Sequence, residues 1–355
     1  MIDGKLNDQV VLSACDELQR AVVMARAGLH RQAHELIDRV RSTKLNLLDV
    51  RVTIWMMLVE GLLAHFESAD PASRDRLMRA LALSEAAGMN ELIARSSAWA
   101  AQMEFEAGCF EKAVDLVNRC LMLGDQAPLD AKVRAYMVAA ACLSCAALDD
   151  QADVYYRKAR LLAIDIGDRA SIGAVLFNQA ALKINSVRLA LVMERMSVHD
   201  AVHTSATLSS SVNFDNLVGA GSLIAVSRVL YAKTFLIQGR YRAALNLLIA
   251  QYGEFSDKVV LKARSAIAVD LAWCHCELGD LGAAVDLLKN SNEIQIDKLD
   301  LDDRIVYYAI LERVESRMGN HESSALSLEE KCRAIVEYDL KISRLRSISE
   351  KVFSV

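Results

Sequence analysis

One short phrase recurs along the chain and constrains the fold more than any other feature of the sequence. A Gly is followed five residues later by an Ala and, four residues after that, by an apolar side chain. The phrase begins at Gly28, Gly108, Gly239 and Gly279. A Gly takes at little cost the positive φ that reverses a chain at the end of a helix. The phrase therefore predicts pairs of antiparallel helices joined by tight turns.

The spacing of these turns indicates a repeat. With the related turns at Ala147 and Gly319, successive turns lie 80, 39, 92, 40 and 40 residues apart. The two long steps each require one further turn, which we expect near Ser68–Pro71 and near Asn185–Ser186. A period near 40 residues is that of one helix–turn–helix unit, so the sequence predicts an all-α solenoid of about eight repeats.

The Ala of each phrase marks the point where paired helices pass most closely, because only a small side chain fits between them. We therefore expect a buried Ala at the equivalent positions Ala33, Ala113, Ala152, Ala244 and Ala284. Ala127 lies in a loop-like segment beside Pro128, and we expect it to be exposed.

The composition is typical of a helical protein. Hydrophobic residues make up 53% of the chain and only 2 of the 355 residues are Pro, which helix interiors exclude. The chain has no apolar run of about 18 residues, the length that suggests a membrane helix, and no signal-peptide pattern. We therefore expect a cytoplasmic protein whose 8 cysteines are reduced and packed as small apolar residues.

The charge balance argues against nucleic acid as a partner. The chain carries 41 basic and 46 acidic residues, for a net charge of −5. Proteins that bind nucleic acid normally carry a basic excess that neutralises phosphates. We therefore expect neither nucleic acid nor a membrane among the partners.

Further positions of the phrase carry a family resemblance. An aromatic residue follows the turn Gly by two positions, as at Phe110 and Tyr241, and a second small residue follows the Ala by seven, as at Cys120 and Ala159. The pattern resembles the tetratricopeptide repeat. It is most similar to the long-period form of the maltose-regulon activator, of Rap-type peptide-sensing regulators and of regions that precede bacterial GGDEF domains. The resemblance spans nearly the whole chain and implies a right-handed superhelical solenoid that binds proteins or peptides.

The longest step between turns suggests how the chain is divided. Its extra residues fall in a stretch rich in Ser, Thr and Asn, which is typical of a loop. We expect N-terminal helical repeats over 1–205, in about five hairpins. An inter-repeat loop or hinge follows over 206–217, then C-terminal repeats over 218–322, and a capping or coiled-coil helix over 323–355. The loop is either a simple connection or a binding element.

Clusters of Cys and His do not indicate a catalytic or metal site. The Cys-x-x-Cys at 142–145 lies late in a helix, whereas redox pairs use a helix N-terminus to lower the thiol pKa. In the Cys-His-Cys run at 274–276, adjacent side chains on a helix point apart. His199 and His203 have the i, i+4 spacing of metal ligands but no third ligand. Since no nucleotide-binding or hydrolase motif occurs either, we expect no enzyme, no cofactor and no metal.

A partner is expected in the concave groove that stacked repeats form with their first helices. Arg95 and Arg134 are 39 residues apart and so occupy the same position in neighbouring repeats. Arginines beside exposed aromatic residues suit an acidic or carboxylate-bearing peptide. Alternatively, they pair with neighbouring glutamates such as Glu106 and Glu277. The predicted partner-binding groove consists of Arg95, Gln102, Phe105, Arg134, Lys233, Trp273, Arg313 and Arg317.

The end of the chain is predicted to be one long helix. Residues 327–353 contain neither Gly nor Pro, and apolar residues recur there at heptad positions, a 3.5-residue period that fits a coiled coil. The helix either caps the last repeat or joins a second copy. A homodimer would use Ile342, Leu345 and Val352.

These features predict a protein- or peptide-binding repeat module that serves as a scaffold or regulatory sensor in bacterial signalling. The alternative is the sensory half of a diguanylate cyclase or a similar signalling enzyme, with its catalytic domain outside this chain.

Overall fold

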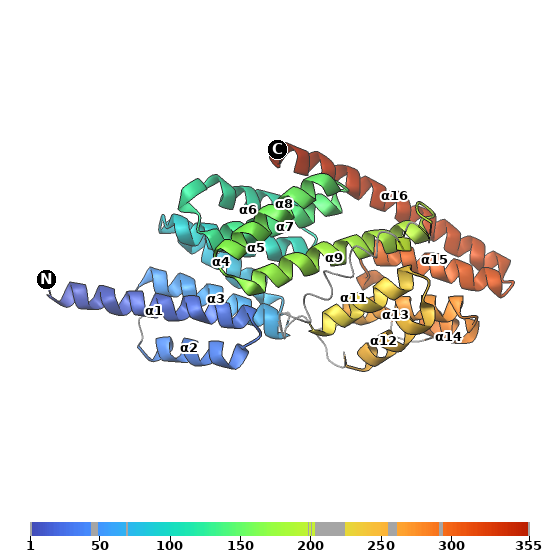
Figure 1. Cartoon of the computed structure of the whole chain (residues 1–355), viewed down its shortest axis with the longest axis horizontal. Helices are drawn as coiled ribbons and strands as arrows, with labels where there is room; N and C mark the ends of the chain where they lie inside the picture. Colours follow the sequence, from blue (N-terminus) through green and yellow to red (C-terminus); the bar gives the residue numbers. More distant parts are fainter. Residues whose placement is uncertain are drawn as a thin grey trace. The chain divides into compact units, whose positions relative to one another are not determined.

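The computed structural model describes residues 2–43, 49–68, 70–197, 199, 201–202, 224–254, 261–290 and 294–353 (Figure 1). Of these residues, 86% are helical and none is in a strand. The predicted all-α class is therefore confirmed. Among the described helices, none combines the length and apolar character needed to cross a membrane.

Most helices are 13–25 residues long. In chain order they are α1 (Ile2–Arg26), α2 (His30–Ser42), α3 (Val50–Ser68), α4 (Ala72–Ala86), α5 (Asn90–Glu106), α6 (Phe110–Met122), α7 (Leu129–Cys145), α8 (Asp149–Asp165), α9 (Arg169–Val192), α11 (Ile224–Ile237), α12 (Tyr241–Glu254), α13 (Leu261–Glu277), α14 (Leu281–Val285), α15 (Leu301–Arg317) and α16 (His321–Val352). A π-helical turn, Asp286–Asn290, continues α14.

Consecutive helices pack in pairs, and the predicted turn residues lie between the members of each pair. The packed pairs are α1 with α2, α3 with α4, α5 with α6, α7 with α8, α11 with α12 and α13 with α14 (Figure 1). The turn glycines have positive φ, for example 73° at Gly108 and 74° at Gly239. Ala147 takes the same conformation at φ 55° although it carries a Cβ. The recurring phrase therefore marks real helix reversals.

Of the two turns inferred from spacing, one is confirmed and one is wrong. The chain does reverse between α3 and α4, where Pro71 directly precedes α4. Helix α9, however, continues through Asn185–Ser186, and the chain turns only after Val192, where Glu194 has a φ of 58°. The helix continues because Ile184 and Val187 are both buried on its inner side.

The small positions of the recurring phrase behave as predicted, whereas the prediction for Ala127 fails. All five alanines are buried, at 0–2% exposure: Ala33, Ala113, Ala152, Ala244 and Ala284. Ala127 is also buried, at 3% exposure, so its expected exposure is wrong. Its backbone N–H donates to the carbonyl of Gly124 in a short 3₁₀ turn, which folds this loop against the protein.

Contacts divide the chain into two compact units. The chain passes from one unit to the other within α9 and again within α16. Unit 1 contains α1–α8, the start of α9 up to Val175, and the chain from Leu345 onward. Unit 2 contains the rest of α9, α11–α15, and α16 up to Arg344. The loop predicted at 206–217 lies outside the described residues, as does His203 of the predicted histidine pair.

The end of α16 packs on unit 1. Phe353 is 2% exposed, and its ring lies 5.5 Å from that of Tyr155 on α8. Arg346 donates to the backbone carbonyl of Ala147, where α7 has just ended. A cation near the C-terminus of a helix is favourable because the last carbonyls are unpaired. The last turns of α16 therefore cap unit 1.

The residues predicted to form a dimer are only partly accessible. Leu345 is 3% exposed in the single chain, and Ile342 and Val352 are half-buried. The dimer stays a prediction, and replacing Leu345 would disturb the packing of unit 1 as well as any seam.

Candidate ligand pocket

Unit 1 contains a pocket of about 540 Å³. Its wall combines aromatic, aliphatic and charged side chains from α1, α3 and α5, from the start of α7, and from the turn between α8 and α9. The lining residues are Gln19, Val22, Val23, Arg26, Ala27, Trp55, Leu58, Leu62, Arg95, Trp99, Asp130, Ile166, Gly167, Asp168, Arg169 and Ala170. The volume falls in the range of small-molecule and peptide side-chain sites.

Arginines stack on both tryptophans of the pocket. The guanidinium carbon of Arg95 lies 5.1 Å from the ring centre of Trp55. That of Arg134 lies 4.0 Å from the ring centre of Trp99, and that of Arg26 lies 5.9 Å from the same ring. Each of these distances is within the reach of a cation–π interaction. The pocket wall is therefore both aromatic and cationic.

Two of the three arginines are neutralised by carboxylates of the pocket. Arg95 donates to Asp130 at 2.9 Å and also pairs with Glu91. Arg26, at the end of α1, donates to Asp168 at 2.9 Å and to Ser171 at 2.6 Å. Burial tends to raise the pKa of Asp168, but the charge of Arg26 together with the hydrogen bonds from Ser171 and Arg26 outweighs it, and the pKa is lowered. The Arg26–Asp168 pair joins the end of α1 to the residue that directly precedes α9.

Arg134 differs from the other two arginines. It is 8% exposed, and among the residues that the structure describes none forms a hydrogen bond or an ion pair with it. Burial and then the charge of Arg26 lower the pKa of Arg134 to about 9. Arg134 is therefore protonated at neutral pH, but its charge is not compensated.

The other residues predicted for the groove in unit 1 have local partners. Gln102 donates to Glu106 at 2.6 Å, and the ring of Phe105 packs at 5.5 Å against that of Phe110. Neither lines the pocket. Of the predicted groove, only Arg95 lines the pocket and only Arg134 borders it, against Trp99.

In unit 2 each predicted groove residue either has a partner within the protein or is buried. Arg313 and Arg317 both pair with Glu277, the arrangement weighed above as the alternative to ligand binding. Lys233 donates to Asn185 at 3.0 Å. Trp273 is 3% exposed, so it belongs to the core and not to an open groove.

A buried charge network lies elsewhere in unit 2. Arg188 is 1% exposed and donates to Asp270 at 2.7 Å and to Asp303 at 2.8 Å. Burial alone would lower the pKa of Arg188, but the two carboxylates outweigh it and raise the pKa. The charges of this network face one another inside unit 2, and Lys233 adds a further cation 4.0 Å from Asp270.

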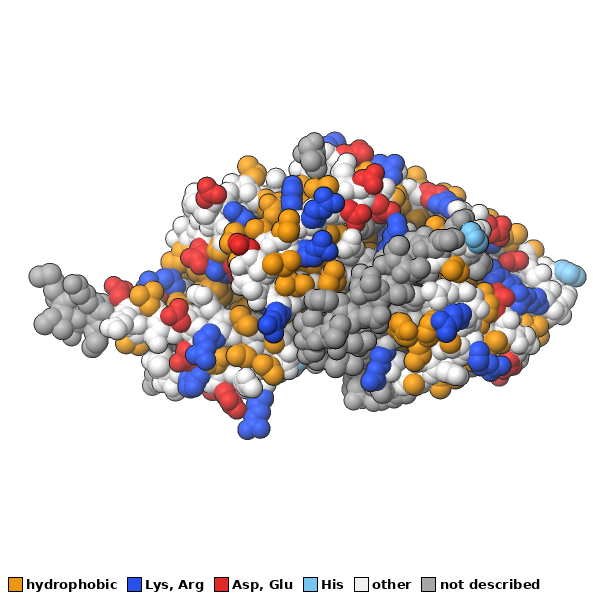
Figure 2. Space-filling model, viewed as in Figure 1, with side chains coloured by type: hydrophobic (Ala, Val, Ile, Leu, Met, Phe, Trp, Pro, Cys, Tyr) orange, Lys and Arg blue, Asp and Glu red, His pale blue; other side chains and the backbone are white. Residues whose placement is uncertain are grey.

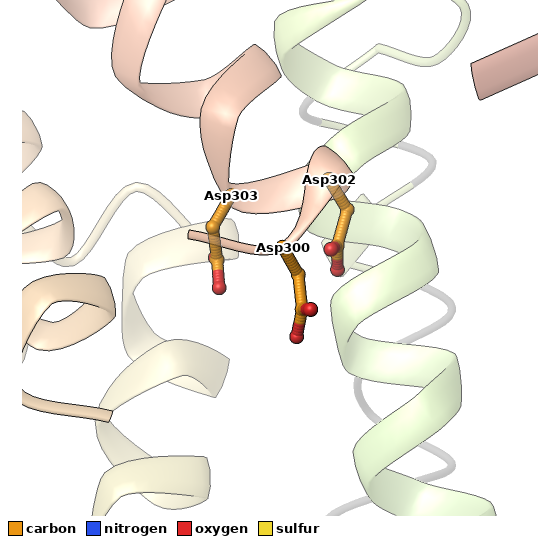
Figure 3. Close-up of side chains that lie close together, drawn as sticks. All are labelled: Asp300, Asp302 and Asp303. Atoms are coloured by element: carbon orange, nitrogen blue, oxygen red, sulfur yellow. The ribbon is translucent and has the colours of Figure 1, made fainter. Parts of the chain in front are cut away.

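Asp303 also belongs to a cluster of carboxylates at the start of α15. The side chains of Asp300, Asp302 and Asp303 point to the same side of the chain, with oxygens within 4.8 Å of one another (Figure 3). Burial, followed by repulsion from Asp303 and Asp300, raises the pKa of Asp302. The N-terminus of α15 stabilises such carboxylates, and Arg188 already binds Asp303.

The cysteine motifs are packed in the core or close to it. Cys142, Cys274 and Cys276 are each 0% exposed, and burial raises the pKa of Cys142 well above its ordinary value. His275, between the last two, bonds to Asp280 at 3.2 Å. These buried thiols behave as small apolar groups, as the sequence predicts, whereas Cys332 is exposed and departs from that prediction.

On the face drawn in Figure 2, cationic and anionic side chains are interspersed, with no large field of one sign among the atoms described there. Arg134 lies in unit 1 over the ring of Trp99, which is a residue of the pocket wall. A comparison with protein families and with characterised proteins gave no match for this chain.

Proposed function

We propose that the protein is a non-enzymatic helical-repeat module that binds an acidic peptide segment of a partner protein in the pocket of unit 1. In this role it acts as a cytoplasmic scaffold or regulatory sensor in bacterial signalling. One observation carries the proposal, namely the pocket of about 540 Å³ walled by Trp55, Trp99 and their stacked arginines.

The chemistry of this wall supports a peptide with carboxylate and apolar side chains. Tryptophan and arginine are the residues that most often dominate binding energy in protein interfaces. Arg26, Arg95 and Arg169 line the pocket against Asp130 and Asp168, and Arg134 adds a further positive charge at its edge. Among the side chains that line the pocket, arginines outnumber carboxylates by three to two, so an anionic ligand is favoured over a cationic one.

The helix pairs support the repeat part of the proposal. The positive-φ turns at Gly28, Gly108, Ala147, Gly239, Gly279 and Gly319 fall at the predicted spacing, and a small buried residue follows each of the first five. A tetratricopeptide-like right-handed solenoid accounts for this regularity, and such arrays commonly bind peptides on their inner face.

Tryptophan fluorescence offers a direct test. The chain has 3 tryptophans, and Trp273→Phe leaves only Trp55 and Trp99, the two in the pocket. This variant should be titrated with a pool of hexapeptides rich in Asp and Glu. A saturable change in emission is expected because the ligand would change the surroundings of both rings.

The control is the same protein with Trp55→Leu and Trp99→Leu added. Because it has no tryptophan left, its binding is measured by the fluorescence anisotropy of labelled peptides. Binding that is unchanged without the two pocket tryptophans would contradict the proposal, as would the absence of any saturable change in the parent variant.

A further inference from the structure

Arg134 is a buried arginine without a counter-ion in the described chain, and this sets it apart. Buried arginines are almost always paired, because an unpaired charge loses its hydration without compensation. Arg188, which is buried to a similar degree, donates to two carboxylates. Arg134 has only the face of Trp99 as a close partner.

The carboxylates nearest to Arg134 already have partners of their own. Asp168 and Glu106 are close enough to favour its charge, but Asp168 accepts from Arg26 and from the backbone N–H of Ser171, while Glu106 accepts from Gln102. Arg26, the remaining charged neighbour, repels it. Among the described residues, therefore, no carboxylate pairs directly with Arg134, because the two nearest ones already have other donors.

Stacking leaves the guanidinium of Arg134 suitably arranged for an anion. A guanidinium that lies over an aromatic ring uses its flat face, so its N–H donors point outward along their common plane. These donors form the fork that binds a carboxylate through two parallel hydrogen bonds. Trp99, which holds this group, is itself part of the pocket wall.

We infer that Arg134, assisted by Arg26 and seated on Trp99, is the anion-recognition site of the pocket and binds a side-chain carboxylate of an acidic peptide. This inference rests on the proposed function, since it assigns the contact that selects an acidic ligand. Arg134 is the specificity-determining residue, whereas Arg95, already paired with Asp130, contributes mainly to the shape of the wall.

The unpaired charge of Arg134 should also affect the stability of the protein without ligand. A buried unpaired charge is unfavourable for folding, so Arg134→Met should melt at a temperature no lower than the parent protein. An arginine whose role is structural should lower the melting temperature when it is removed. The melting temperature therefore distinguishes a ligand-binding arginine from a structural one without any ligand.

The binding test uses the Trp273→Phe protein and two pools of hexapeptides, one rich in Asp and Glu and the other with Asn and Gln at the same positions. In Arg134→Gln and Arg134→Met, affinity for the acidic pool should fall about tenfold or more, since loss of one partner from a desolvated charge pair weakens binding strongly. The neutral pool should bind weakly to all three proteins. Arg157→Met, which removes an exposed arginine of unit 1 outside the pocket, is the matched control and should leave affinity unchanged.

Each remaining outcome is decisive. If the acidic and neutral pools bind the parent equally, or if both Arg134 variants bind the acidic pool like the parent, the anion site is wrong while peptide binding stands. If neither pool binds the parent, both the anion site and the proposed function are wrong.

Discussion

Arg188→Met is expected to lower the free energy of unfolding by about 3–5 kcal/mol, the usual cost of removing one partner from a buried ion pair. The change removes the arginine that both carboxylates contact, while Lys233, 4.0 Å from Asp270, remains as a cationic neighbour in an ion pair. Asp270 is 0% exposed and Asp303 is 9% exposed, so water cannot readily replace the guanidinium. Urea-induced unfolding followed by circular dichroism measures the effect.

A second arginine of unit 2 provides the matched control. Arg195 pairs with Asp339 at 2.7 Å, but both side chains are 49% exposed. Exposed pairs contribute about 0–1 kcal/mol, so Arg195→Met should change stability by no more than that. Equal effects of the two substitutions would contradict the buried network described for unit 2.

Phe353→Ala is expected to cost about 3–5 kcal/mol, as for other fully buried aromatic side chains. The ring is 2% exposed and packs against Tyr155, so its loss leaves a cavity where the end of α16 meets unit 1. Leu340→Ala, at a position of α16 that is 67% exposed, should have little effect. Thermal unfolding of both variants is the measurement. If Phe353→Ala melts like the parent, the last residues do not cap unit 1.

The helix pairs could be predicted because their signals are local. The turn Gly is required by the backbone conformation of the turn, and the Ala five residues later is required by the close packing of the two helices. Both requirements can be recognised within a short stretch of sequence. The turn after Val192 was misplaced because Glu194 takes the positive φ that Gly usually supplies. Ala127 was misjudged because a neighbouring Pro suggests a loop but does not show whether that loop packs inward.

The pocket could be predicted only in part. Arg95 and Arg134 were found through their equivalent spacing, but that spacing does not show whether a carboxylate lies nearby. Arg26 and Asp168 are 142 residues apart, and only the path of the folded chain brings them together. Trp55 and Trp99 were missed because they lie 44 residues apart, off the 39- and 40-residue steps. The chain has only 3 tryptophans, and this rarity was the one signal in the sequence that could have pointed to them.

Photo-crosslinking tests the central claim, that unit 1 binds its ligand in this pocket, most directly. An acidic hexapeptide with a benzophenone group is irradiated with the full chain, and the labelled residues are identified by mass spectrometry. The account predicts labels on α1, α3, α5 and residues 166–170, which an excess of the unlabelled peptide suppresses. Labels confined to α11–α15, or labels that the competitor does not reduce, would contradict it.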